Sequence, residues 1–281
     1  MTSPPNTSLP DGARPLDPLQ VRLVTLNIRY ATKRPGPGEE PWAVRCPRLC
    51  AQLRFITSGQ DSPFISISAT GVRTAKKLGE HSPIFFRADR WECERSRTLW
   101  LSPTPDTPSR GWDAALERIV TMGSFRHRAT GTVVVVMSTH LDHRGEVARE
   151  QSARLLISLA RTWPEQPSHR VAPSPVFLGG DFNSTPTGRA YNILVEPGSG
   201  ITDISDLAAE EGKYGNREVT YTTFGDGSEE PKRIDFLFVR NPERFRFLTF
   251  SILPNVFDDK VFLSDHRPVV ADVEVPVQAA M

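Results

Sequence analysis

The feature that most constrains the fold is a series of short apolar runs separated by Gly, Pro and Ser. The runs are rich in β-branched and aromatic residues, which is typical of buried β-strands. Strands are predicted at residues 21–28, 63–68, 83–87, 98–101, 118–125, 132–139, 176–180, 233–239, 247–253 and 269–275. Helical periodicity occurs only at 41–56, 145–163 and 189–195. Many strands with few helices predict an α/β sandwich of two sheets with helices outside.

Composition limits the class of protein. Of 281 residues, 38% are hydrophobic and 24% charged, as in ordinary globular proteins. The 34 Lys and Arg residues balance 33 Asp and Glu residues, so the chain lacks the basic excess of a tight nonspecific nucleic-acid binder. No apolar run approaches the length of a membrane span, and the N-terminus does not resemble a secretory signal. We therefore expect no membrane span and an intracellular, cytoplasmic location; the sequence leaves the oligomeric state open.

Domain organisation follows from the distribution of proline. Residues 1–20 contain five prolines and few apolar side chains, which predicts a disordered N-terminal segment. The strand-like runs then continue without a linker to the end, which predicts one domain over residues 21–277. Three cysteines without zinc-site spacing are expected to be free thiols.

Polar side chains stand at the ends of several predicted strands. Side chains alternate faces along a strand, so His140 and Asp142 are expected on one side. By the same rule Asp181 and Asn183 share a face, while Phe182 points into the core. Each residue alone has an ordinary structural explanation, such as turn chemistry. Their combination and order carry the functional signal.

Five short motifs, in this order, resemble those of the endonuclease/exonuclease/phosphatase superfamily. They are Asn27, Ser138-Thr139-His140, Gly180-Asp181-Phe182-Asn183, Ile234-Asp235 and Ser264-Asp265-His266. The resemblance extends from about residue 21 to about residue 275. Residues 79–86 and 111–115 are similar to a microbial and fungal branch often grouped with CCR4-like members. The resemblance implies a DNase I-like four-layer sandwich, in which two packed sheets are flanked by helices.

The same resemblance implies a metal-dependent phosphoesterase. The cofactor would be Mg²⁺, with Mn²⁺ as an alternative, held by the oxygen ligands Asn27 and Asp265. Asp181 would orient or deprotonate the attacking water, and Asn183 would bind the phosphate or fix Asp181. The choice of base between Asp181 and His266 stays open.

Two histidines complete the implied catalytic set. His266 would contact the phosphoryl group or act as the base, with Asp235 holding its ring in one tautomer. This role predicts that Asp235 and His266 lie within hydrogen-bonding distance. His140 would donate to the phosphate and could protonate the leaving oxygen.

One family feature is missing. The family normally carries a metal-binding glutamate in a Gln-Glu pair after its second core strand, whereas here residues 63–68 are followed by Ala69. The region 66–72 is shortened, and the nearest carboxylate, Glu80, belongs to another motif. The leading interpretation is a nuclease-like enzyme of the 3′–5′ RNA exonuclease type, acting on RNA rather than DNA. Alternatives are a small phosphoester or lipid head group as substrate, and a catalytically impaired pseudoenzyme or truncated product.

Overall fold

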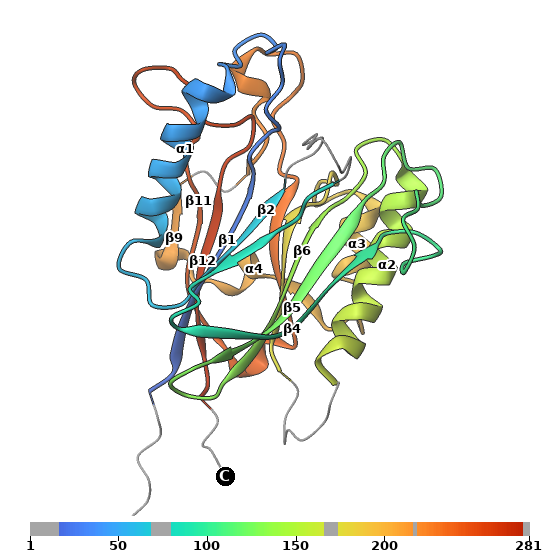
Figure 1. Cartoon of the computed structure of the whole chain (residues 1–281), viewed down its shortest axis with the longest axis vertical. Helices are drawn as coiled ribbons and strands as arrows, with labels where there is room; N and C mark the ends of the chain where they lie inside the picture. Colours follow the sequence, from blue (N-terminus) through green and yellow to red (C-terminus); the bar gives the residue numbers. More distant parts are fainter. Residues whose placement is uncertain (1–16, 69–79, 166–173, 216–217, 278–281) are drawn as a thin grey trace, which may run out of the picture.

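The computed structural model describes residues 17–68, 80–165, 174–215 and 218–277 (Figure 1). Most of the segment expected to be disordered, residues 1–16, lies outside the described residues. Strand β1 (Leu19–Asn27) begins before the expected start at Val21, because the backbone of Leu19 pairs with Val275. No helix in the described part of the chain is long and apolar enough to cross a membrane.

The described strands form two six-stranded sheets. The first has the order β3 (Ile84–Phe86), β2 (Pro63–Ser68), β1, β12 (Val269–Val275), β11 (Arg246–Ile252) and β9 (Lys213–Gly215). The second has the order β4 (Trp91–Trp100), β5 (Ile119–His127), β6 (Val133–His140), β7 (Val176–Asp181), β10 (Asp235–Arg240) and β8 (Ile201–Asp203).

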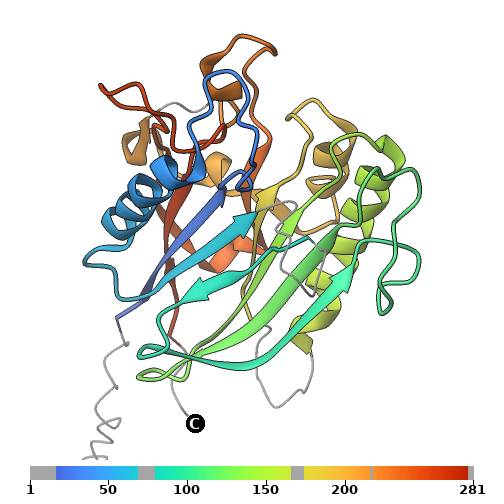
Figure 2. The same cartoon turned by 45° about the horizontal axis from the view of Figure 1, so that its top comes forward.

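The two sheets pack face to face, and helices cover their outer faces (Figures 1 and 2). Val134 and Val136 of β6 join the core between the sheets, whereas Val135 and Met137 join the core beneath α2 (Glu146–Thr162) and α3 (Arg189–Leu194). Helix α1 (Trp42–Thr57) covers the first sheet. A strand covered on both faces needs a continuous apolar run, which explains the four successive valines of β6. The expected four-layer, DNase I-like sandwich is confirmed.

Strand direction brings the polar strand ends to one edge of the sandwich. Strands β1 and β2 are parallel, as are β6 and β7, while β10 runs antiparallel to β7 and β12 antiparallel to β1. The ends of β1, β6 and β7 therefore meet the starts of β10 and β12. In register, Asp181 is paired with both His140 and Asp235.

The largest departure from the predicted elements is β4. The sequence predicts a strand only at 98–101, whereas β4 extends back to Trp91. Its earlier part contains Glu92, Glu94, Arg95 and Arg97 and lacks an apolar pattern. This strand lies at a sheet edge with most of its side chains exposed, and charged residues are common at such edges. Strands β8 and β9 and the short helix α4 (Ile204–Leu207) also lacked a sequence signal.

Candidate active site

A cavity of about 380 Å³ opens at the edge where the strand ends meet. Six of the seven sequence-predicted site residues line it: Asn27, His140, Asp181, Asn183, Asp265 and His266. The seventh, Asp235, is fully buried beside His266. Both sheets contribute, since Asn27 ends β1 and Asp181 ends β7. The structure therefore brings the whole predicted set into one place.

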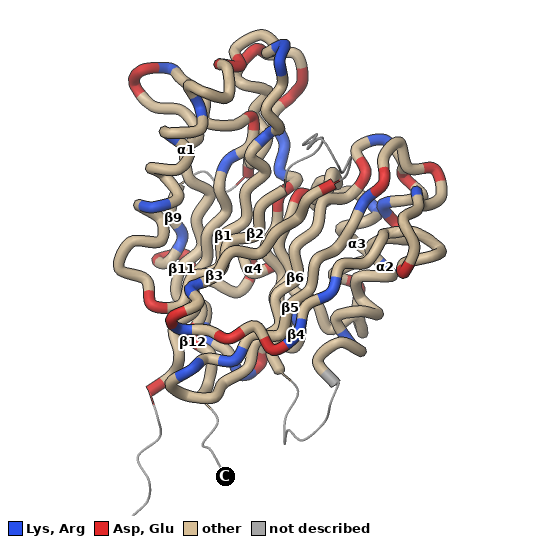
Figure 3. The backbone as a smooth tube through the Cα atoms, viewed as in Figure 1, with Lys and Arg blue, Asp and Glu red and all other residues tan. Residues whose placement is uncertain are grey.

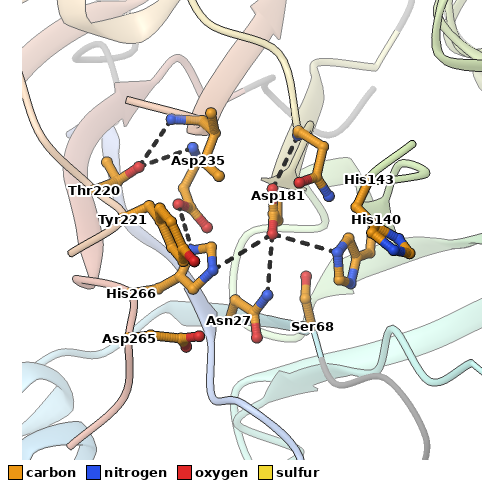
Figure 4. A network of polar contacts seen from close by, with 12 residues as sticks. Asn27, Ser68, His140, His143, Asp181, Thr220, Tyr221, Asp235, Asp265 and His266 are labelled. Atoms are coloured by element: carbon orange, nitrogen blue, oxygen red, sulfur yellow. Dashed lines mark hydrogen bonds and ion pairs between the residues drawn. The ribbon is translucent and has the colours of Figure 1, made fainter. Parts of the chain in front are cut away.

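The carboxylate of Asp181 stands at the centre of the site (Figure 4). Its Oδ2 lies 3.0 Å from Nδ2 of Asn27, 3.3 Å from Nε2 of His140 and 3.7 Å from Nε2 of His266. Its Oδ1 accepts a hydrogen bond of 2.9 Å from the backbone N–H of Asn183. Asp181 is thus surrounded by nitrogen atoms from the ends of β1 and β6 and from the segment that precedes β12.

Three residues of the Gly180-Asp181-Phe182-Asn183 segment have local structural roles that hold Asp181 in place. A Cβ on Gly180 would lie 2.0 Å from the carbonyl oxygen of Thr139, so only glycine permits this close approach of β7 to β6. Phe182 is completely buried, as expected. Asn183 has a φ of 47°, a left-handed conformation that asparagine tolerates, and its Nδ2 donates to the carbonyl of Leu141. This turn directs Asp181 and Asn183 into the same cavity.

His266 is paired with Asp235, as the sequence predicted. Nδ1 of His266 and Oδ2 of Asp235 are 2.8 Å apart. The backbone N–H groups of Ile234 and Asp235 donate to the hydroxyl of Thr220, which fixes the start of β10 (Figure 4). Burial alone would lower the pKa of His266, but Asp235 and Asp181 outweigh this effect and raise its pKa to about 10. His266 is therefore a cation at neutral pH.

His140, in contrast, is uncharged at neutral pH. Burial, reinforced by the nearby Arg118 cation, lowers its pKa to about 3, so the ring is neutral. Its Nδ1 lies 3.0 Å from Oε1 of Glu80, but the two groups are not aligned as a hydrogen bond. One neutral and one cationic imidazole thus flank Asp181.

Glu80 and Arg118 lie next to His140, and the sequence interpretation gave neither of them a role in the site. Nη1 of Arg118 donates to Oε1 of Glu80 at 2.8 Å, and both side chains are almost fully buried. Burial raises the pKa of Glu80 to about 7, although Arg118 opposes the shift. The sequence did identify Glu80 as the nearest carboxylate to the missing pair. Arg118 lies 38 residues from Glu80 in the sequence, and no local sequence pattern links residues at that separation.

Asp142 does not share the cavity with His140. Strand β6 ends at His140, so the alternation of side chains does not continue to Asp142. Its carboxylate instead accepts backbone N–H donors from Leu116, Arg144 and Gly145. Burial would raise the pKa of Asp142, but these hydrogen bonds lower it to about 2. Asp142 holds the loop after β6.

The donor set fits a hard divalent cation. Asp181, Asp235 and His266 each place one ligand atom within 4.8 Å of the others, so this group could hold a metal. His266 is a poor ligand while it carries its proton, which leaves carboxylate and amide oxygens. The side chains of Asp181, Asp265 and Asn27 line the cavity, and oxygen ligands are what Mg²⁺ prefers. Oδ1 of Asn27 accepts a hydrogen bond of 3.0 Å from the backbone N–H of Arg29.

Strand β2, after which the family carries its glutamate, ends beside β1. Ser68 ends β2 in register with Asn27, and its hydroxyl donates to the carbonyl of Thr139 at 3.2 Å. Ala69 and most of the shortened region lie outside the described residues.

A family model and similar solved structures point to the same protein family. The model of the endonuclease/exonuclease/phosphatase family matches residues 150–266. An endonuclease/exonuclease/phosphatase from Bacteroides vulgatus is 30% identical, with a TM-score of 0.74 over 91% of this chain and 99% of that chain. A family protein from Bacteroides thetaiotaomicron is 26% identical, with a TM-score of 0.76 over 92% and 98%.

A mannosyl-6-phosphatase from the same organism is 25% identical, with a TM-score of 0.74 over 90% of this chain and 99% of that chain. No curated protein sequence matches the chain.

Proposed function

The chain belongs to the endonuclease/exonuclease/phosphatase family, whose members are hydrolytic phosphoesterases, and from this we propose that it hydrolyses a small phosphoester. The observation that carries the proposal is the carboxylate of Asp181 between a neutral His140 and a cationic His266. Phosphoryl transfer needs a positioned nucleophile and positive charge near the phosphoryl oxygens. These three side chains can supply both.

The charge states favour one assignment of the base. His266 already carries a proton at neutral pH and cannot accept another, which leaves Asp181 to orient and deprotonate the attacking water. The His266 cation would stabilise charge that develops on the phosphoryl oxygens, with Asp235 orienting the ring. Asn183 and the neutral His140 would donate hydrogen bonds to the phosphate.

Asn27 and Asp265 would hold Mg²⁺, with Mn²⁺ as an alternative. The bound cation would neutralise phosphate charge. The pseudoenzyme alternative rests on Ala69, outside the described residues, whereas the described site offers both a base and cations.

A small substrate is favoured over a nucleic-acid strand. Strand binding depends on Lys and Arg contacts to successive phosphates, yet positive and negative residues are interspersed along the loops above both sheets (Figure 3). The similar mannosyl-6-phosphatase agrees with a small substrate. Single-stranded RNA is the second candidate, because Tyr30 and Tyr221 line the cavity and aromatic rings stack on the bases of a single strand.

Steady-state hydrolysis tests the proposal. With Mg²⁺, we expect turnover of p-nitrophenyl phosphate to exceed that of bis(p-nitrophenyl) phosphate and of single-stranded RNA. Asp181→Asn should lower turnover by at least about 10²-fold, in the range for acid–base residues. Asp106→Asn, at an exposed carboxylate that does not line the cavity, is the matched control. Full activity of Asp181→Asn would overturn the assignment, and faster cleavage of RNA would favour the second candidate.

A further inference from the structure

A second cavity of about 270 Å³ opens beside the first. The two cavities share His143, Asn183, Lys232 and Ile234 as lining residues. A substrate whose phosphate lies near Asp181 would therefore extend directly into the second cavity. The remainder of this cavity is built by the first turns of α2 and α3 and the loop after β7.

Two of its three strong cations are already neutralised. Arg189 lies 2.7 Å from the carboxylate of Glu150, and Lys232 lies 2.6 Å from that of Glu229. A second phosphate of the substrate would thus compete with carboxylates for both cations. Paired cations of this kind are weak evidence for a polyanion site, because the local charge is balanced.

The remaining strongly charged residues are Glu146 and Arg149, which do not form an ion pair with each other. Arg149 is half-buried, and its Nη1 donates to the carbonyl of Asp142 at 3.0 Å, which anchors the guanidinium at the cavity wall. Glu146 is exposed and has no hydrogen-bond or ion-pair partner among the described residues. The Glu146 carboxylate would repel a second phosphate but accept hydrogen bonds from hydroxyl groups.

The polar groups of the wall include both acceptors and donors. Glu146 can only accept, Arg149 can only donate, and the hydroxyl of Thr185 can do both. Neighbouring hydroxyl groups on a carbon chain or ring also donate and accept, so they can satisfy such a wall. A single negative group or an apolar group would leave part of it unpaired.

We propose that the second cavity binds the alcohol portion of the substrate and that this alcohol is a neutral, polyhydroxylated compound of the sugar class. Glu146 and Arg149 are then specificity-determining residues. The inference rests on the proposed phosphoesterase function and adds the class of leaving group. It accounts for two adjoining cavities of different character, one for the phosphate and one for the hydroxyl groups.

The test compares two phosphomonoesters. A hexose 6-phosphate carries hydroxyl groups into the second cavity, whereas p-nitrophenyl phosphate carries none. We expect Glu146→Ala to lower the ratio of kcat/KM for the sugar phosphate to that for p-nitrophenyl phosphate by about 10-fold or more, as for loss of a hydrogen bond to a charged group. Arg149→Ala should act in the same direction. Glu146→Ala is the cleaner variant because the Glu146 carboxylate has no hydrogen-bond or ion-pair partner among the described residues.

Arg154→Ala, an exposed position on the same helix, is the matched control. An unchanged ratio in Glu146→Ala would overturn the proposal, as would a wild-type preference for a diphosphorylated sugar over its monophosphate. Absence of hydrolysis of every ester would instead count against the proposed function. In that case calorimetry on Asp181→Asn decides. Binding of the hexose 6-phosphate at least about 10-fold tighter than inorganic phosphate, lost on adding Glu146→Ala, supports the cavity, and equal affinities contradict it.

Discussion

The two sides of the site each place a buried histidine beside a carboxylate, but one ring is a cation and the other is neutral. On one side, His266 is hydrogen-bonded to Asp235, a buried carboxylate whose second oxygen has no partner among the described residues. On the other side, His140 also lies beside a carboxylate, that of Glu80, but Arg118 already occupies it. The pKa of His266 rises to about 10 while that of His140 falls to about 3.

This difference shows that a neighbouring carboxylate is not sufficient to charge a buried histidine. Burial favours the neutral ring on both sides. Only a carboxylate that is aligned with the ring and free of a competing cation overcomes this effect. The arrangement places one cation and one neutral donor around Asp181, which suits a site that must bind phosphate and leave a base available.

The largest effect should come from Asp235→Asn. Removing this carboxylate takes away the main partner that keeps His266 protonated, so the cation that balances phosphoryl charge is lost. We expect turnover to fall by about 10²- to 10³-fold, the range for removal of one preorganised electrostatic group. Steady-state rates with p-nitrophenyl phosphate provide the measurement, and circular dichroism confirms folding. A loss of less than about 3-fold would show that His266 does not need its charge.

The stability of the metal-free protein should depend on His266 above neutral pH. Because its folded pKa lies above the unfolded value, its contribution is fully present below about pH 6.5 and is lost as pH rises through about 10. Between these values the wild type should lose at least about 2 kcal/mol more stability than His266→Gln. Urea unfolding in a chelator across this window measures the difference. Parallel losses in both proteins would contradict the raised pKa.

A smaller change should make the two sides more alike. Arg118→Met removes the cation whose charge, after burial, contributes most to lowering the pKa of His140. We expect the pKa of His140 to rise by about one unit or more, equivalent to roughly 1.4 kcal/mol. A histidine titration followed by NMR would detect it. An unchanged or lower pKa would mean that burial alone sets the charge state of His140.

The sequence located most of the site because its signals are local. Asp181, at the end of β7, and His266, just before β12, lie in compact motifs. The apolar runs next to these motifs predict the strands that bring the two residues together. The same runs predict most strands of both sheets. They do not predict β8, β9 or the first part of β4, whose charged edge position removes its apolar pattern.

Other features depend on distant contacts. The pairing of Glu80 with Arg118 follows from how the strands are arranged and has no signal in either segment. Asp142 was expected in the cavity because strand alternation was extended past the true end of β6. The charge states of the histidines depend on burial and on these pairings, so they could not be read from residue types alone.

The central claim is that the two histidines flanking Asp181 differ in charge, and NMR of ¹⁵N-labelled imidazoles in the metal-free protein tests it most directly. At pH 8 we expect His266 to show two protonated ring nitrogens and His140 to show one protonated and one unprotonated nitrogen. His266→Gln and His140→Gln would assign the signals. Titration of both rings with a common pKa near 6.5 would contradict the account. The pKa values of His266 and His140 would then not be separated by the effects of Asp235 and Arg118.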